Sequence, residues 1–183
     1  MASLYLIRHA CTKMTGDVTE RWPLSEEGQQ QADILARQSF WREVELVLSS
    51  PEHKALQTAK PAAHCWSIPL ETADCLREVH RPHLIPDYEN TIARCFSNPE
   101  TGIEGLEPAA QAVERITRCI KGLVAEYPGK TLAAVSHGLV TALFLARLEG
   151  HWPTVPEWHA IPFAGHAVLD TTTWHLTKNW SSV

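Results

Sequence analysis

The sequence lacks several features that define large classes of protein. Its composition is ordinary, with 44 % hydrophobic and 20 % charged residues, which excludes disorder, collagen and coiled coil. No basic segment precedes the first apolar run, so no signal peptide is predicted. The five scattered cysteines include no Cys-x-x-Cys pair, which predicts reduced thiols and a cytoplasmic protein. The late histidines show no tight ligand spacing, so no metal site is predicted from His151, His159, His166 and His175.

The chain also lacks an excess of positive charge. Its 16 Lys and Arg residues against 21 Asp and Glu give a formal net charge of −5. This balance argues against a general binder of nucleic acid or of a membrane surface. The most apolar stretch, 132–148, is interrupted at 136–138 and falls short of a membrane span. The length of 183 residues suits a single domain, 1–183.

Apolar and amphipathic runs alternate along the chain, and they predict strands and helices in turn. Strands are expected at 4–7, 44–48, 68–72 and 131–135, and a closing hairpin at 166–170 and 174–177. Helices are expected from 26 to about 40 with Ser25 as N-cap, from Pro51 with Ser50 as cap, from about 107 to 127, and at 139–148. Pro61 should end or kink the second helix. The four late tryptophans, Trp152, Trp158, Trp174 and Trp180, are expected to pack the hairpin.

This alternation favours an α/β fold, a three-layer α/β/α arrangement around a mostly parallel central sheet. Three prolines interrupt the segment 79–106, where only one short helix, near 89–96, is expected. Long irregular segments in compact domains are often functional. We therefore expect 79–106 to be an insertion or lid over a site.

Reactive side chains follow several of the predicted strands. Arg8 and His9 follow the first, Lys54 lies shortly after the second, Glu78 comes after the third, and His137 follows the fourth. Ligands of open parallel sheets bind at the carboxyl ends of the strands. The sequence therefore predicts a guanidinium, an ammonium, two imidazoles and a carboxyl at one edge.

This set of groups suits phosphoryl transfer, which depends on positioning and on stabilising the phosphoryl oxygens. Arg8 supplies a planar fork for two oxygens, and Lys54 adds a point charge. A neutral His9 can attack phosphorus and form a covalent intermediate. Glu78 can protonate the leaving oxygen and then activate water, while His137 donates a hydrogen bond to the phosphoryl group.

Five segments, in order along the chain, resemble the motifs of the histidine phosphatase superfamily, also called phosphoglycerate mutase-like. They are LIRHACT at 6–12, PLSEEG at 23–28, SSPEHKALQTA at 49–59, LRE at 76–78 and VSHG at 135–138. The resemblance implies the phosphoglycerate mutase-like fold, and His9 as phosphohistidine nucleophile with Glu78 as proton donor and acceptor. It places Arg8, Lys54, His137 and Gly138 around the phosphate and Thr12 near the substrate. It implies no metal and no cofactor.

Two residues depart from the family pattern. Ala10 stands where the family has glycine, which costs little if the backbone φ there is negative. Lys54 stands where the family has a second arginine, so the charge is kept but the bidentate grip is lost. A hydrogen bond to a charged group contributes about 1.5–3 kcal/mol, so this change could slow turnover roughly ten- to a hundredfold.

Three functions remain open at this point. The first is hydrolysis of a phosphomonoester through phosphohistidine, on a small phosphorylated substrate or a phosphoprotein. The second is a phosphoglycerate-type mutase, which the short middle segment disfavours. The third is a non-catalytic module that binds a phospho-ligand or a protein, motivated by Lys54 and Ala10. Four basic residues of the irregular segment either read the rest of an anionic substrate or are solvated: His80, Arg81, His83 and Arg94. The oligomeric state is not predicted.

Overall fold

The computed structural model describes residues 3–183, and its central feature is a six-stranded mixed sheet with helices on both faces. The strands are β1 (Ser3–Arg8), β2 (Leu46–Ser49), β3 (Leu70–Thr72), β4 (Leu132–Ser136), β5 (His166–Asp170) and β6 (Leu176–Ser181). The helices are α1 (Glu26–Ala36), α2 (His53–Trp66), α3 (Tyr88–Ser97), α4 (Ala109–Glu126), α5 (Gly138–Leu148) and α6 (Val155–His159). Short 3-10 turns cover Thr19–Arg21, Ser39–Glu43 and Asp74–Leu76.

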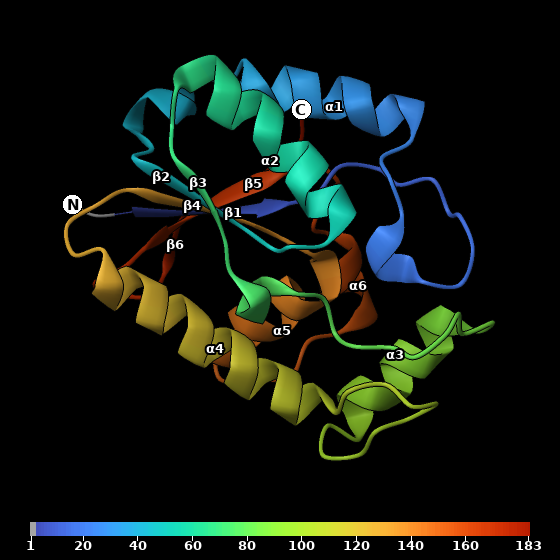
Figure 1. The fold of residues 1–183 in the computed structure, drawn as a ribbon. Helices are drawn as coiled ribbons and strands as arrows, with labels where there is room; N and C mark the ends of the chain where they lie inside the picture. Colours follow the sequence, from blue (N-terminus) through green and yellow to red (C-terminus); the bar gives the residue numbers. More distant parts are fainter. Residues whose placement is uncertain (1–2) are drawn as a thin grey trace.

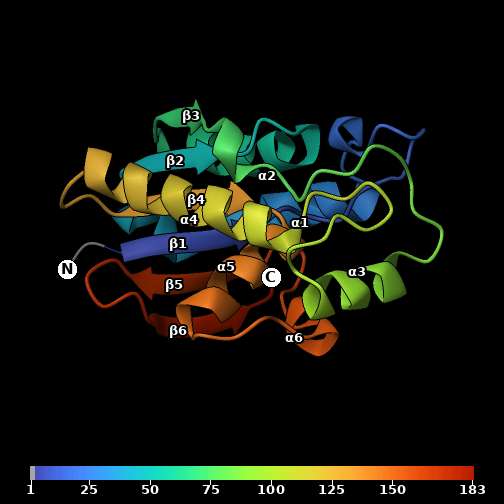
Figure 2. The same cartoon turned by 90° about the horizontal axis from the view of Figure 1, so that it is seen from below.

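The sheet has the strand order β3-β2-β4-β1-β5-β6, in which β1 to β4 are parallel and β5 and β6 form the antiparallel edge. Helices α1 and α2 cover one face, and α4 and α5 cover the other (Figure 1). The view from below shows α4 and α5 in front of the strands, and α3 and α6 beyond one end of the sheet (Figure 2). The predicted three-layer, mostly parallel α/β fold is confirmed.

The inner strands are apolar throughout because both faces are covered. Alternate residues of the same strand enter two separate cores. Leu4 and Leu6 of β1 pack under α4 and α5, whereas Tyr5 and Ile7 pack under α1 and α2. This double burial fixes the register of β1 between β4 and β5, and with it the position of Arg8 at the end of the strand.

Helix α2 differs from the prediction at its start and in its middle. It begins at His53 with Glu52 as N-cap, two residues after the predicted start. It then continues through Pro61 to Trp66, so of the two predicted effects, an end or a kink, the end does not occur. Its apolar face continues past the proline with Ala62 and Ala63, and packing on the sheet outweighs the lost backbone hydrogen bond.

The ends of two other elements also differ from their predicted limits. Helix α1 ends at Ala36 rather than near 40, because Trp41 Nε1 donates to the Leu35 carbonyl at 2.8 Å and the chain turns into a 3-10 segment. Strand β6 begins at Leu176, while Trp174 lies in the preceding turn with a φ of 58°. Within residues 3–183, no helix combines the length and apolar character that crossing a membrane requires.

Candidate active site

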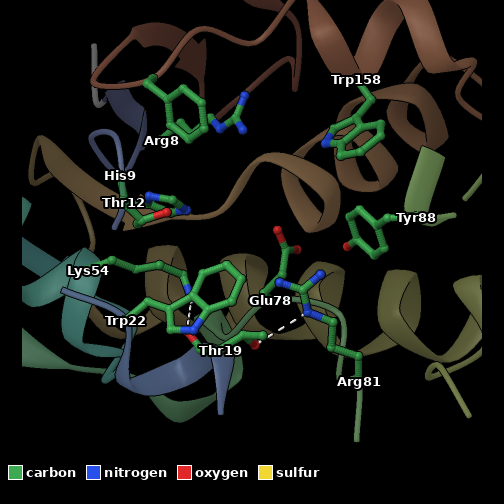
Figure 3. Close-up of a pocket in the computed structure, with 11 residues that line it drawn as sticks. Arg8, His9, Thr12, Thr19, Trp22, Lys54, Glu78, Arg81, Tyr88 and Trp158 are labelled. Carbon is green, nitrogen blue, oxygen red and sulfur yellow. Dashed lines mark hydrogen bonds between the residues drawn. The ribbon is translucent and has the colours of Figure 1, made fainter. Parts of the chain in front are cut away.

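A pocket opens where β1 to β4 end, and it encloses about 550 Å³ of space that includes open solvent. Five of the seven predicted site residues line it: Arg8, His9, Thr12, Lys54 and Glu78. Figure 3 shows these side chains around one opening, with the Glu78 carboxyl between Arg8 and Arg81. The strand ends therefore bring residues separated by up to 70 positions to one site, as the parallel sheet predicts.

His9 is held in a single orientation. It is 6 % exposed, and its Nδ1 lies 2.8 Å from the Ala10 carbonyl oxygen. Because a carbonyl can only accept, Nδ1 carries the proton and Nε2 keeps its lone pair. Burial lowers the pKa of His9 well below its usual value, and the neighbouring His137 and Lys54 lower it further. The ring is therefore neutral at neutral pH, as a nucleophile must be.

The loop after His9 accepts alanine at position 10 without backbone strain. Ala10 is fully buried and is not among the non-glycine residues of 3–183 that have a positive φ. Its N–H donates to Thr58 Oγ1 of α2 at 3.0 Å. Gly28 of α1 is needed beside this loop, because a Cβ there would lie 1.9 Å from the Cys11 carbonyl oxygen.

Lys54 points into the protein rather than into solvent. It is 6 % exposed, and its Nζ lies 2.5 Å from Glu52 Oε2 and 3.0 Å from the Thr19 carbonyl oxygen. Lys54 is therefore not a solvated surface residue. The lysine is part of the pocket wall, but its positive charge is matched by a buried carboxylate at contact distance.

Sequence reasoning missed Glu52, which connects three residues of the site. Besides the ion pair with Lys54, its Oε1 accepts from the Glu78 N–H at 2.9 Å and lies 3.4 Å from His137 Nε2. Its side chain is 3 % exposed. The only signal in the sequence was an acidic residue two positions before Lys54, which reads as a favourable charge at a helix start.

His137 and Gly138 lie beneath the pocket instead of lining it. His137 is fully buried, with its ring centroid 5.1 Å from that of His9 and its Nε2 2.8 Å from Ser50 Oγ. Within residues 3–183, His137 Nδ1 and Arg8 Nε are buried polar atoms with no partner. Gly138 allows Arg8 to lie close, since a Cβ there would be 2.8 Å from Arg8 Nε. Unpaired buried polar atoms are costly, which makes this pair a candidate for binding a ligand.

Glu78 sits at the N-terminus of α5. Its Oε1 accepts from the Val140 N–H at 2.8 Å, and its Oε2 accepts from the Leu139 N–H at 3.1 Å. Desolvation raises the pKa of Glu78 above its usual value, while the hydrogen bonds from Val79, Val140 and Leu139 act in the opposite direction. A carboxyl with a raised pKa is suited to hold a proton for general acid catalysis.

A disulfide and an arginine fix the segment that carries Glu78. The structure joins Cys75 to Cys119 of α4, with 5.7 Å between the two Cα atoms, so the prediction of reduced thiols is wrong for this pair. The packing of 74–76 against α4 brings together two cysteines that are 44 residues apart, which no local spacing could show. Arg115 of α4 donates to the carbonyls of Cys75, Arg77 and Glu78.

The segment 79–106 contributes two residues to the pocket, Arg81 and Tyr88, and forms the predicted short helix as α3. His80 and His83 are exposed, and Arg94 lies 3.7 Å from Glu104. Trp158 of α6 lines the pocket too, whereas it was expected to pack the hairpin. The aromatic side of the site is thus partly built by a helix that the sequence pattern did not predict.

The sequence matches a known protein family. The model of the histidine phosphatase superfamily (branch 1) matches residues 4–178. The chain belongs to this superfamily. A structure of mycobacterial glucosyl-3-phosphoglycerate phosphatase with VO3 is similar, with a TM-score of 0.78 at 22 % identity over 100 % of both chains.

A second similar structure is the phosphoserine phosphatase from Entamoeba histolytica in complex with 3-phosphoglyceric acid. Its TM-score is 0.77 at 21 % identity, over 100 % of this chain and 98 % of that one. At 21–22 % sequence identity, the similarity to these two structures shows the fold alone. No curated protein matches the chain.

Proposed function

We propose that this histidine phosphatase superfamily member hydrolyses phosphomonoesters through a phosphohistidine at His9. The observation that carries the proposal is the state of His9: neutral, anchored through Nδ1, and with Nε2 free beside a pocket that contains Arg8 and Glu78. A free imidazole lone pair next to a guanidinium and a protonatable carboxyl supplies a nucleophile, an oxyanion partner and a general acid.

The reaction has two steps, and its protons balance. His9 Nε2 attacks phosphorus while the bond to the leaving oxygen breaks, and Glu78 gives that oxygen its proton. Glu78, now a carboxylate, takes a proton from water as the water oxygen attacks the phosphohistidine. Inorganic phosphate leaves, and both His9 and Glu78 return to their starting states.

The phosphoryl oxygens are stabilised by donors that lack partners. Phosphoryl oxygens would give Arg8 Nε and His137 Nδ1 the hydrogen-bond acceptors that these buried atoms lack. This supports the roles of Arg8 and His137 in phosphate binding. Gly138 leaves the space for Arg8, and Thr12 lines the pocket. The proposed steps are carried by side chains, without a metal ion.

One observation favours a second candidate, a protein that binds phospho-ligands without turning them over. The charge of Lys54 is matched by Glu52, which weakens the pull on a phosphate compared with a free cation. The two functions differ in phosphate release. We expect the purified protein to release phosphate from an aryl phosphate, and His9→Ala to remove that release.

Thr141→Ala, a buried substitution on α5 away from the pocket lining, serves as a matched control and should keep the activity. Binding of phosphate esters in calorimetry without any release would refute hydrolysis and favour the binding module. Movement of phosphate between the carbons of phosphoglycerate, with little free phosphate, would instead identify a mutase.

A further inference from the structure

Aromatic rings surround the opening above the nucleophile. Trp22, Tyr88, Trp158 and Phe163 line the same pocket as His9 and come from four separate segments of the chain. The Tyr88 and Trp158 rings meet edge to face, with centroids 5.8 Å apart. A phosphoryl group is bound by N–H and cationic donors, so it makes no use of these rings. They are available to whatever group the phosphate is attached to.

The ring next to the reacting groups is also the most exposed of the four. Phe163 is 36 % exposed, with the Arg8 guanidinium 3.8 Å from its centroid and the His9 ring 5.7 Å away. Of the exposed large apolar side chains of residues 3–183, Phe163 lines this pocket. An exposed apolar ring in a pocket marks a binding surface for an apolar group.

Arg81 provides a cation that is held flat at the same opening. Its guanidinium lies 4.6 Å from the Tyr88 ring centroid and 5.4 Å from that of Trp22, and its Nε donates to Thr19 Oγ1 at 3.4 Å. No Asp or Glu of residues 3–183 forms an ion pair with it, in contrast to Lys54. The charge of Arg81 is therefore available to an anionic group on the substrate.

From this arrangement we infer the substrate class: a phosphomonoester whose leaving group is a flat aromatic ring that carries an anionic substituent. The inference rests on the proposed function. The phosphoryl group lies at His9 and Arg8, the ring packs among Phe163, Tyr88 and Trp158, and the substituent pairs with Arg81.

The ring is tested with benzyl phosphate and cyclohexylmethyl phosphate. The two esters have the same charge, the same number of carbons and a primary alcohol as leaving group, so they differ in the flatness of the ring. We expect kcat/KM to be about three- to tenfold higher for the benzyl ester, since ring–ring contacts add to burial. Trp158→Leu should reduce this ratio, whereas Trp66→Leu at the far end of α2 should leave it unchanged.

The substituent is tested with 4-carboxybenzyl phosphate against benzyl phosphate. We expect the carboxylate to raise kcat/KM about fivefold, and Arg81→Gln to bring the ratio of kcat/KM between the two esters close to one. Arg118→Gln, which changes an exposed arginine on α4, is the control and should preserve the gain.

The outcomes separate this inference from the proposed function. Equal rates on the benzyl and cyclohexylmethyl esters would overturn the aromatic leaving group and leave hydrolysis intact. If the benzyl ester is preferred over the cyclohexylmethyl ester, but neither the carboxylate nor Arg81→Gln changes kcat/KM, the inference of an anionic substituent is overturned. If no phosphomonoester releases phosphate, the proposed function itself fails.

Discussion

Replacing Glu52 with glutamine should weaken the fold and strengthen phosphate binding at the same time. Glutamine keeps an oxygen that can accept from the Glu78 N–H, but it removes the negative charge 2.5 Å from Lys54 Nζ. Removal of one partner of a buried ion pair costs about 3–5 kcal/mol. We expect the lower end, about 3 kcal/mol, because Lys54 keeps its bond to the Thr19 carbonyl. For a chain of this size that corresponds to a melting temperature lower by about 6–12 °C.

The gain in phosphate affinity follows from the same charge. At an effective dielectric constant of about 20 and a separation of about 8 Å, a carboxylate repels a unit negative charge by about 2 kcal/mol. Its removal should therefore lower the dissociation constant of inorganic phosphate by at least about tenfold. Because phosphate binds the folded state, the stability gap between Glu52→Gln and the wild type should shrink as phosphate is added.

Urea unfolding measures the loss of stability in Glu52→Gln. Titration calorimetry with inorganic phosphate at low ionic strength measures the gain in phosphate affinity. Lys54→Met is the matched variant, and it should also lose stability but bind phosphate more weakly. The double variant Glu52→Gln/Lys54→Met should be more stable than the sum of the single losses predicts, since neither charge is then left unpaired. Unchanged or weaker phosphate binding by Glu52→Gln would show that Glu52 does not neutralise Lys54 in the pocket.

Three further predictions concern pH and redox state. Because the raised pKa of Glu78 keeps it protonated for catalysis at low pH, kcat/KM should fall as pH rises through that pKa, and Glu78→Gln should abolish this limb in a pH–rate profile. The pKa values of His9 and His137 are lowered in the fold, so stability is full above pH 6.5, the unfolded value, and is lost below it. In urea unfolding, the free energy of unfolding should fall by up to about 1.4 kcal/mol per pH unit for each imidazole ring as pH drops below 6.5. If His9→Gln leaves this dependence of stability on pH unchanged, the pKa of His9 is not lowered in the fold. Cys75→Ala/Cys119→Ala should lower the free energy of unfolding by about 2–4 kcal/mol, and a wild type equally stable with and without reductant would argue against the bridge.

The pocket residues that the sequence could locate lie at or after the ends of predicted strands. Arg8 ends β1, His9 follows it, and Glu78 comes shortly after β3. A parallel sheet brings such positions to one edge whatever their separation. The fold class was predictable for the same reason, because buried parallel strands leave continuous apolar runs that separate cleanly from amphipathic helices. The motif also led to Lys54, which lines the pocket, but it gave no sign of the ion pair between Lys54 and Glu52.

The residues that were missed depend on tertiary contacts. Glu52 matters because Lys54 and His137 pack against it, and neither contact has a local signature. Trp158 and Phe163 reach the pocket through α6 and the following turn, a stretch of isolated aromatic residues with no helical or strand period. The start of α2 also involves a tertiary contact: the Ser50 hydroxyl bonds to His137 as well as accepting from the Glu52 N–H at 3.3 Å, and the helix begins at His53.

If a phosphoryl group is transferred to His9 during turnover, the phosphohistidine can be trapped and located. Wild-type protein mixed with an aryl phosphate and quenched in base within milliseconds should carry one phosphoryl group, on the peptide that contains His9, by mass spectrometry. Glu78→Gln should accumulate more phosphohistidine, because it lacks the carboxylate that activates water for the second step. His9→Ala should carry no phosphoryl group. Steady release of phosphate by the wild type with no label on His9, or with the label on another residue, would contradict the account.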